Sequence, residues 1–309
     1  MTRLRRLRPA IKAGASRLLV LGGAPALLRL GRRQDALVLA YHNIVPDDAP
    51  PSGDVPLHLP RSRFAEQMEV IARCCEPVSL ADLLIPPRKR STRPRVAITF
   101  DDAYRGAVTL GAAELARRDI PATVFVAPHF LGRTFWWDAI RWPAGGSWGV
   151  PFRDHSLNAL AGRDDLVRSA AVAEGFVLEQ PPDYSWCASE EELRRAVATA
   201  PIALGSHTWS HPNLAALPGP DLYEELRRPL EWLSTRFDRT ESILAYPYGQ
   251  LSNAAVATAR DVGYRAAVGI AGGWMRGLPR DPFRMPRLNV ARDLSMDGFV
   301  LATAGLARI

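Results

Sequence analysis

Continuous apolar runs alternate with helical patterns along most of this 309-residue chain, and this alternation restricts its fold more than any other feature. Runs such as Val96–Phe100 (VAITF) leave no polar face for water, which is typical of strands in a parallel sheet covered on both sides. Strands are predicted at Ala36–Tyr41, Val96–Phe100, Ala122–Ala127, Ile202–Gly205 and Ile243–Tyr246, with fainter patterns at Tyr264–Val268 and Arg287–Val290.

Helical patterns separate these runs, at Arg63–Arg73, Ala107–Arg118, Asp221–Phe237 and Asn253–Val262. Asp221 and Glu224 have the spacing of a capping box in which Asp replaces Ser or Thr, so we expect a helix to begin there. About seven strands alternating with helices predict an α/β protein, either a barrel or a doubly wound sheet.

One segment breaks the alternation. From about residue 130 to 200 the chain is rich in Trp, Gly and charge, and we expect a helical and irregular insertion between two strands. The predicted organisation is a basic N-terminal helix or tail, residues 1–33, followed by a single domain, residues 34–309, that contains this insertion.

The net charge of +7 comes from the N-terminus. Residues 1–33 contain no acid, whereas the rest of the chain holds 30 basic and 32 acidic residues, so nucleic acid is not an expected partner. The basic residues of the tail are Arg3, Arg5, Arg6, Arg8, Lys12, Arg17, Arg29, Arg32 and Arg33.

The apolar stretch of this tail is short. Leu18–Leu21 is followed by Gly22, Gly23 and Pro25, well below the ~20 apolar residues that a spanning helix needs. We expect a basic helix that is either solvated or lies on an anionic membrane, with a cleaved signal peptide as the alternative. The predicted location is the cytoplasm, at the inner membrane face, or else outside the cell.

The three cysteines, Cys74, Cys75 and Cys187, form no C-x-x-C pair. This count excludes a disulfide framework and a cysteine zinc site, and fits a reducing compartment.

Polar motifs follow several predicted strands. Asp101 and Asp102 come directly after the second strand, where two carboxylates can share one site or one can cap the next helix. His207 and His211 follow the fourth strand, four residues apart, a spacing that suits one metal ion or two capping side chains. Pro212 places this pair on a turn.

Three further motifs share this position. Tyr246–Gly249 is a turn that can aim a backbone N–H outward, His42 follows the first strand, and Arg287 at a strand boundary could pair with a carboxylate. In a parallel barrel, the carboxyl ends of the strands form the rim that holds active sites. The residues expected at this rim are His42, Asp101, Asp102, His207, Tyr248 and Arg287.

In this order, T-F-D-D, G-S-H-T-x-x-H-P-N-L and Y-P-Y-G resemble the polysaccharide deacetylases of carbohydrate esterase family 4. The resemblance runs from about Tyr41 to Val290 and includes the early Tyr-His pair and Phe135–Asp138. It implies a distorted (β/α)7 barrel that uses a metal ion to remove N-acetyl groups from an amino sugar or polysaccharide.

The resemblance also implies residue roles. Asp102, His207 and His211 would hold one divalent metal ion, with zinc expected and cobalt or nickel also suited to these ligands. Asp101 would be the general base, and the N–H of Tyr248 would help to bind the oxyanion.

Two departures from the family pattern require substitutes. Many members have Arg where this chain has Ala245, and we expect Arg287 to orient the base instead. Many members end with a histidine that serves as general acid, but no histidine follows His211 here. Members that open with Tyr-His resemble a permuted arrangement in which that early histidine is the acid, and His42 fits this position. Trp209, Trp136 and Trp137 are candidates to stack on a sugar ring.

Other functions fit the same sequence. An O-acetyl esterase, a deformylase of a lipid-linked sugar, a metal-bound glycan-binding protein without turnover, and a scaffold that acts through its basic tail are the alternatives. The expected partner is an N-acetylated glycan or lipid-linked sugar, with peripheral contact to an anionic membrane through residues 1–33.

Overall fold

The computed structural model describes residues 14–87, 89–141 and 149–306. Its strands are β1 (Asp35–Tyr41), β2 (Asn43–Val45), β3 (His58–Pro60), β4 (Glu76–Pro77), β5 (Arg95–Phe100), β6 (Ala122–Val126), β7 (Ile202–Ser206), β8 (Thr240–Ala245), β9 (Ala266–Val268), β10 (Met275–Arg276) and β11 (Leu288–Asn289). Its α-helices are a first helix at residues 14–21, α2 (Ala24–Gly31), α3 (Arg61–Cys74), α4 (Ala112–Ala116), α5 (Trp136–Ala139), α6 (Val150–Asp154), α7 (Asp164–Ala173), α8 (Glu190–Thr199), α9 (Gly219–Arg236), α10 (Asn253–Val262) and α11 (Met296–Ala302).

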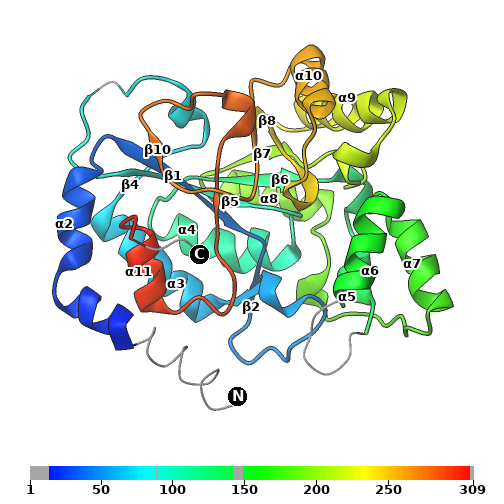
Figure 1. Cartoon of the computed structure of the whole chain (residues 1–309), viewed down its shortest axis with the longest axis horizontal. Coiled ribbons are helices and arrows are strands. Elements are labelled where there is room, and N and C mark those ends of the chain that lie inside the picture. The colour runs from blue at the N-terminus through cyan, green and yellow to red at the C-terminus, as the bar shows by residue number, and fades with distance from the viewer. Residues whose placement is uncertain (1–13, 88, 142–148, 307–309) are drawn as a thin grey trace.

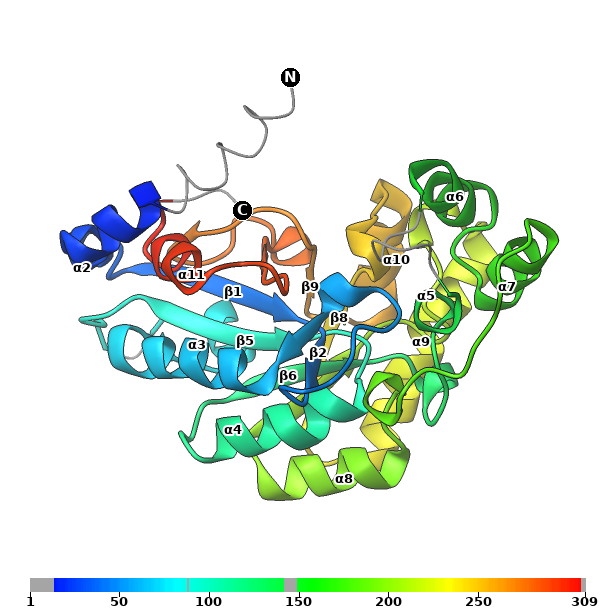
Figure 2. The same cartoon turned by 90° about the horizontal axis from the view of Figure 1, so that it is seen from below.

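The main sheet curls into a barrel (Figures 1 and 2). Strands β1, β5, β6, β7, β8 and β9 pair in this order, and each pair is parallel. The chain after β9 spans the remaining gap, because Met285 bridges Val268 while Leu288 of β11 pairs with Leu39 of β1. These seven parallel strands make the distorted (β/α)7 barrel that the sequence predicts.

Both faces of the strands are buried, which explains the continuous apolar runs. Because successive strand residues point to opposite faces, Val38, Ala97 and Ile243 join one apolar cluster while Leu37 and Val96 join another with the covering helices. At the carboxyl ends of the strands, the sequence therefore changes from apolar to polar residues.

The predicted strands and helices are present, but one predicted helix start is wrong. The helix α9 begins at Gly219 after Pro218, and Asp221 lies within its first turn without capping it. Pro220 explains the earlier start, because its fixed φ suits the first turn of a helix. The capping box lies instead at Ser189 and Glu192, at the start of α8.

The long connection from β6 to β7 contains α5, α6, α7 and α8. Helix α8 contacts β7 and the π-helical turn Ala107–Gly111, so it belongs to the outer layer of the barrel. Helices α5, α6 and α7 lie together at one end of the molecule (Figure 2), beyond the carboxyl ends of the strands. This connection thus adds one wall to the rim. Within the described residues, no helix combines the length and apolar character needed to cross a membrane.

Candidate active site

Four strands deliver polar side chains to one cavity of about 180 Å³. His42 follows β1, Asp101 and Asp102 follow β5, and the remaining groups follow β7 and β8. The residues that line the cavity are His42, Asp54, Leu57, Asp101, Asp102, Trp137, Arg153, His207, His211, Tyr248, Gly249, Ile270 and Asn289.

Asp102, His207 and His211 form a compact, buried cluster. The Oδ1 atom of Asp102 lies 3.5 Å from His207 Nε2 and 3.3 Å from His211 Nε2. The two Nε2 atoms lie 3.1 Å apart. Three potential ligand atoms therefore converge on one point.

Hydrogen bonding directs these atoms toward a shared ion. His207 Nδ1 lies 2.8 Å from the carbonyl oxygen of Ala245, which only an N–H can satisfy, so its Nε2 keeps a lone pair. Asp102 Oδ1 is buried and has no hydrogen-bond partner among the described residues. Two imidazoles and a carboxylate in this state fit a divalent ion such as zinc.

The backbone around these ligands is in a conformation that L-residues rarely adopt. Asp102 and His211 have φ of 67° and 58°, while Ala103, Thr208 and Tyr248 also lie in the left-handed region. Each such residue costs of order 1–3 kcal/mol, and such residues cluster at functional sites. His211 is held in part by a hydrogen bond from its N–H to Thr208 Oγ1 at 3.0 Å.

Burial sets the protonation states of the cluster. It lowers the pKa of His207 to about 4 and that of His211 to about 3, so both rings are neutral at pH 7. It raises the pKa of Asp102 to about 6 in the metal-free protein. At pH 7 the two neutral imidazoles and a largely ionised Asp102 are therefore ready to bind a cation, and below pH 6 a proton must leave Asp102 first.

Asp101 has the opposite environment. Burial alone would raise the pKa of its carboxyl, but Arg287 holds it well below its ordinary value. Two guanidinium nitrogens each donate to a different oxygen of Asp101 at 2.7 Å, and both side chains are buried. Arg287 thus lies where a residue that orients Asp101 must lie.

His42 lines the cavity on the far side of Asp101, with Nε2 4.0 Å from Asp101 Oδ2. Burial lowers the pKa of His42, and the nearby carboxylates of Asp101 and Asp102 oppose this effect.

Tyr248 lies opposite, in a turn where its φ is 57°. Its hydroxyl donates to Gly162 O at 3.3 Å and accepts from Trp136 Nε1 at 3.3 Å, which fixes the turn against the inserted segment.

The three candidate tryptophans occupy different places. Trp137 lines the cavity, with its ring centroid 5.2 Å from that of His211. Trp136 is fully buried beside Tyr248 and does not line the cavity. The guanidinium carbon of Arg228 lies 3.9 Å from the ring centroid of Trp209. Trp209 is also outside the cavity lining. Trp137 is therefore the tryptophan placed to meet a ligand.

A buried polar network behind Trp137 was not predicted. Trp137 Nε1 donates to Tyr104 Oη at 2.8 Å, and that hydroxyl donates to Asp138 Oδ2 at 2.5 Å. The other oxygen of Asp138 accepts from His58 Nε2 at 3.0 Å and from the N–H of Asp54 at 3.3 Å. The rarity of histidine in the chain was the one available signal for His58.

Glu225 of α9 was also missed, and it holds the loop between His207 and His211. Its Oε2 accepts the N–H groups of Trp209 and Ser210 at 2.9 and 2.8 Å, and its Oε1 accepts the Ser210 hydroxyl at 2.6 Å. The loop that presents His207 and His211 is therefore anchored to the outer helix layer.

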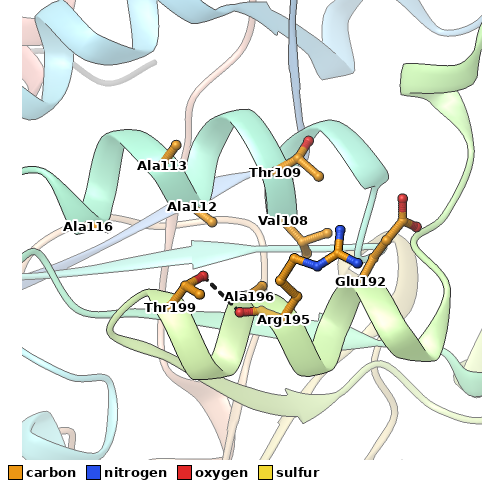
Figure 3. A pocket seen from close by; sticks show the side chains of 9 residues that line it. All are labelled: Val108, Thr109, Ala112, Ala113, Ala116, Glu192, Arg195, Ala196 and Thr199. Carbon is orange, nitrogen blue, oxygen red and sulfur yellow. Dashed lines mark hydrogen bonds between the residues drawn. The ribbon is translucent and has the colours of Figure 1, made fainter.

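A larger cavity of about 440 Å³ lies between the helical segment 107–116 and α8 (Figure 3). Four of its nine lining residues are alanines, and its carboxylate, Glu192, is bound to Arg105 at 2.9 Å and to the N–H of Ser189 at 2.8 Å. This groove presents no cluster of catalytic groups, so the chemistry belongs to the smaller cavity at the rim.

Comparison with known proteins agrees with this geometry. The family model for polysaccharide deacetylase matches residues 88–267, which is more than half of the chain and includes Asp101, Asp102, His207, His211 and Tyr248. A search of curated proteins finds no match to this chain.

Several solved structures share the fold. IcaB from Ammonifex degensii is 19% identical with a TM-score of 0.59, over 89% of this chain and 98% of that one. The deacetylase PplD from Streptococcus pyogenes, in complex with acetate, is 14% identical with a TM-score of 0.58, over 87% and 98%. A de-N-acetylase from Aggregatibacter actinomycetemcomitans is 15% identical with a TM-score of 0.58, over 85% and 98%.

Proposed function

Because this chain belongs to the polysaccharide deacetylase family, we propose that it is a metal-dependent hydrolase that removes N-acetyl groups from an amino sugar or polysaccharide. One observation carries the proposal. A carboxylate kept ionised by Arg287 lies directly beside a buried cluster of Asp102, His207 and His211 in a single cavity.

Asp102, His207 and His211 would hold the ion. A divalent ion bound there lowers the pKa of a bound water to about 7 and polarises the acetyl carbonyl. The chain's own contribution is to supply neutral imidazoles, a carboxylate without another partner, and a loop anchored by Glu225.

Asp101 is the general base. Arg287 occupies both of its oxygens and so fixes the plane of the carboxylate while keeping it unprotonated. The Asp101 carboxylate accepts a proton from the attacking water, and a base held in place in this way contributes about 10²–10⁴-fold to the rate.

Tyr248 and His42 act on the two ends of the scissile bond. The backbone N–H of Tyr248, in its left-handed turn at the cavity wall, donates to the developing oxyanion. The His42 imidazolium gives its proton to the departing amine, which leaves acetate and a free amino sugar. Trp137 provides an aromatic face for the sugar ring.

The substrate we propose is an N-acetylated glycan. This choice rests on family membership and on the de-N-acetylase among the structures with this fold. Because an amide, an ester and a formamide present similar carbonyls to the cavity, the group removed must be identified by product analysis.

The test is acetate release from a panel of N-acetylglucosamine oligomers with zinc supplied, for wild type beside Asp102→Ala. Release by wild type alone supports the proposal. Metal is measured in the same samples, and a wild type that binds no zinc contradicts it.

A parallel panel with O-acetylated and N-formylated sugars separates the related chemistries. Acetate from O-acetyl sugars alone would indicate an esterase, and formate alone a deformylase. Sugar binding without product, in metal-loaded protein, would indicate a glycan-binding protein.

A further inference from the structure

The first helix (residues 14–21) and α2 expose leucines to solvent. Leu18 and Leu27 are 72% and 71% exposed, and the others lie on the same two helices. We call these residues the leucine surface: Leu18, Leu19, Leu21, Leu27 and Leu30.

Two arginines at the C-terminal end of α2 face the protein instead. Arg29 of α2 donates to the carbonyl of Val300 at 3.1 Å and to the hydroxyl of Thr303 at 3.2 Å, in and beside α11. Arg32 donates to Asp35 at 3.2 Å and lies 5.0 Å from the ring centroid of Trp274. At this end of α2 the amphipathic pattern of a soluble surface helix is thus inverted, with Arg29 and Arg32 inward and Leu27 and Leu30 outward.

The charged residues of these two helices and their ends are all basic. Arg17 and Arg33 are exposed, and Arg17 lies 3.7 Å from Asp297 of α11. Residues 14–33 contain Arg17, Arg29, Arg32 and Arg33 and no acid, and the preceding sequence adds only basic charge. A second copy of this chain would bring like charges together. An anionic lipid surface would meet the exposed Arg17 and Arg33 with opposite charge and the leucines with hydrocarbon.

We propose that the leucine surface docks this protein on an anionic membrane, as a peripheral contact in which the leucines enter the lipid interface. This goes beyond the proposed hydrolase activity and does not depend on it. It gives a structural basis to a membrane contact that the tail composition alone only suggested.

The fold also sets the orientation of the docked protein. Helix α2 leads into β1 at Asp35 (Figure 2), whereas the other end of this strand, Tyr41, is followed by His42 of the cavity lining. Seven strand residues separate the two ends by about 23 Å. The cavity therefore lies on the end of the barrel that faces away from the leucine surface, and the docked protein would act on glycan displaced from the bilayer rather than on a sugar at headgroup level.

Co-sedimentation of the full chain with vesicles tests the docking. We compare vesicles of phosphatidylcholine alone with vesicles that also contain phosphatidylglycerol, at low and high salt. We expect binding to the anionic vesicles, at least about tenfold weaker at high salt because surface charge is screened. Leu18→Gln combined with Leu27→Gln should lose most of this binding.

Val172→Gln combined with Val177→Gln is the matched control, because these valines are similarly exposed in the β6–β7 connection. It should bind vesicles like wild type, and circular dichroism should show that both double variants are folded. Wild-type binding by the leucine variant, or equal binding to neutral vesicles, would overturn the proposal. So would a wild-type dimer that the leucine substitutions dissociate and that binds no vesicle.

The orientation has its own test. Vesicle-bound protein should release acetate from a water-soluble oligomer as fast as free protein, since the cavity faces away from the bilayer. Loss of activity on docking would overturn the orientation. A chain that is inactive in both states would contradict the proposed function, while the sedimentation result would still decide the docking.

Discussion

Arg287 and Asp101 form a two-point ion pair inside the barrel, with each terminal guanidinium nitrogen 2.7 Å from a different carboxylate oxygen. The third nitrogen, Nε, donates to the carbonyl of Gly269 at 2.5 Å, so the guanidinium is held on both sides. Arg287 lies in the segment that precedes β11. Ala245, at the end of β8, accepts a hydrogen bond from His207 through its carbonyl oxygen. Arg287, from the segment before β11, thus contacts the Asp101 carboxylate. Ala245, at the end of β8, has no polar side-chain atom that could do so.

Replacing Arg287 with Gln should raise the pKa of Asp101. Burial then raises that pKa without the opposing cation, so the acid limb of the kcat/KM profile should move to higher pH, and kcat at pH 7 should fall about 10²-fold or more. Arg284→Gln is the control, because Arg284 is exposed and pairs with Asp281 on the surface. An unshifted acid limb in Arg287→Gln would contradict this role.

The same variant should lose stability with a defined pH dependence. The pKa of Asp101 is lowered in the folded protein, so the stabilisation is fully present above its ordinary value of 3.8 and is lost as the pH falls below it. Breaking a buried pair costs about 3–5 kcal/mol, so urea unfolding at pH 7 should show a deficit of that order. The deficit should shrink as the pH falls below 3.8. A constant deficit across that range would argue against the ion pair as its source.

Zinc affinity should fall as the medium becomes acidic. The pKa of Asp102 is about 6 in the metal-free protein, so below pH 6 each ion must displace a proton from this carboxyl. The histidines, with pKa values of about 4 and 3, compete only at lower pH. Isothermal titration between pH 5 and 8 should show a tenfold loss of affinity per pH unit, about 1.4 kcal/mol, on the acid side only. Chelation should abolish activity and zinc should restore it, whereas a flat affinity profile would exclude Asp102 as a ligand that titrates.

Glu225→Gln should weaken metal binding without touching a ligand. The substitution puts an amide where Glu225 now accepts two N–H groups and a hydroxyl, so the His207–His211 loop loses part of its anchor. Loss of such supporting contacts costs about 10–100-fold in affinity. Glu224→Gln is the matched control, because its carboxylate pairs only with the exposed Arg227 among the described residues. Equal zinc affinity in the two variants would remove Glu225 from this role.

His42→Gln should affect substrates according to their leaving groups. An amine must be protonated as it departs, so deacetylation of an N-acetyl sugar should slow by about 10²–10⁴-fold. An activated aryl acetate needs no such proton and should be hydrolysed at close to the wild-type rate. Equal losses on both substrates would show that His42 is not the general acid.

Tyr104→Phe should loosen the cavity wall. It removes the hydroxyl between Trp137 and Asp138, leaving a buried indole N–H without its partner, at a cost of about 1–3 kcal/mol. If Trp137 supports the sugar ring, KM for glycan should rise while zinc affinity stays unchanged. An unchanged KM in a folded, destabilised protein would confine the network to a structural role.

The sequence predicted those features that depend on residues close together in the chain. The strand at Val96–Phe100 is a continuous apolar run, the helix at Asn253–Val262 has its own periodicity, and His207 and His211 lie within five residues. Arg287 was proposed because it lies at a strand boundary and because this chain has Ala245 where many family members have an arginine. Its pairing with Asp101, 186 residues away, could not be read from any local pattern.

Other features depend on tertiary packing alone. His58 and Asp138 belong to different segments with no shared motif, and their contact exists only once the β6–β7 connection folds over the rim. Trp209 follows a metal ligand in sequence, yet the loop turns its ring under Arg228. A residue's neighbours in sequence therefore predicted its chemistry at the strand ends and failed where two distant segments meet.

The short stretch from Met285 to Asn289 closes the gap between β9 and β1 and also carries Arg287. Closure of the barrel and formation of the Arg287–Asp101 ion pair therefore depend on the same five residues. Asp102, His207 and His211 all precede Arg287 in the sequence, and none of them pairs with it. Local unfolding of Met285–Asn289 would therefore open the barrel and remove the counterion of Asp101 in the same step.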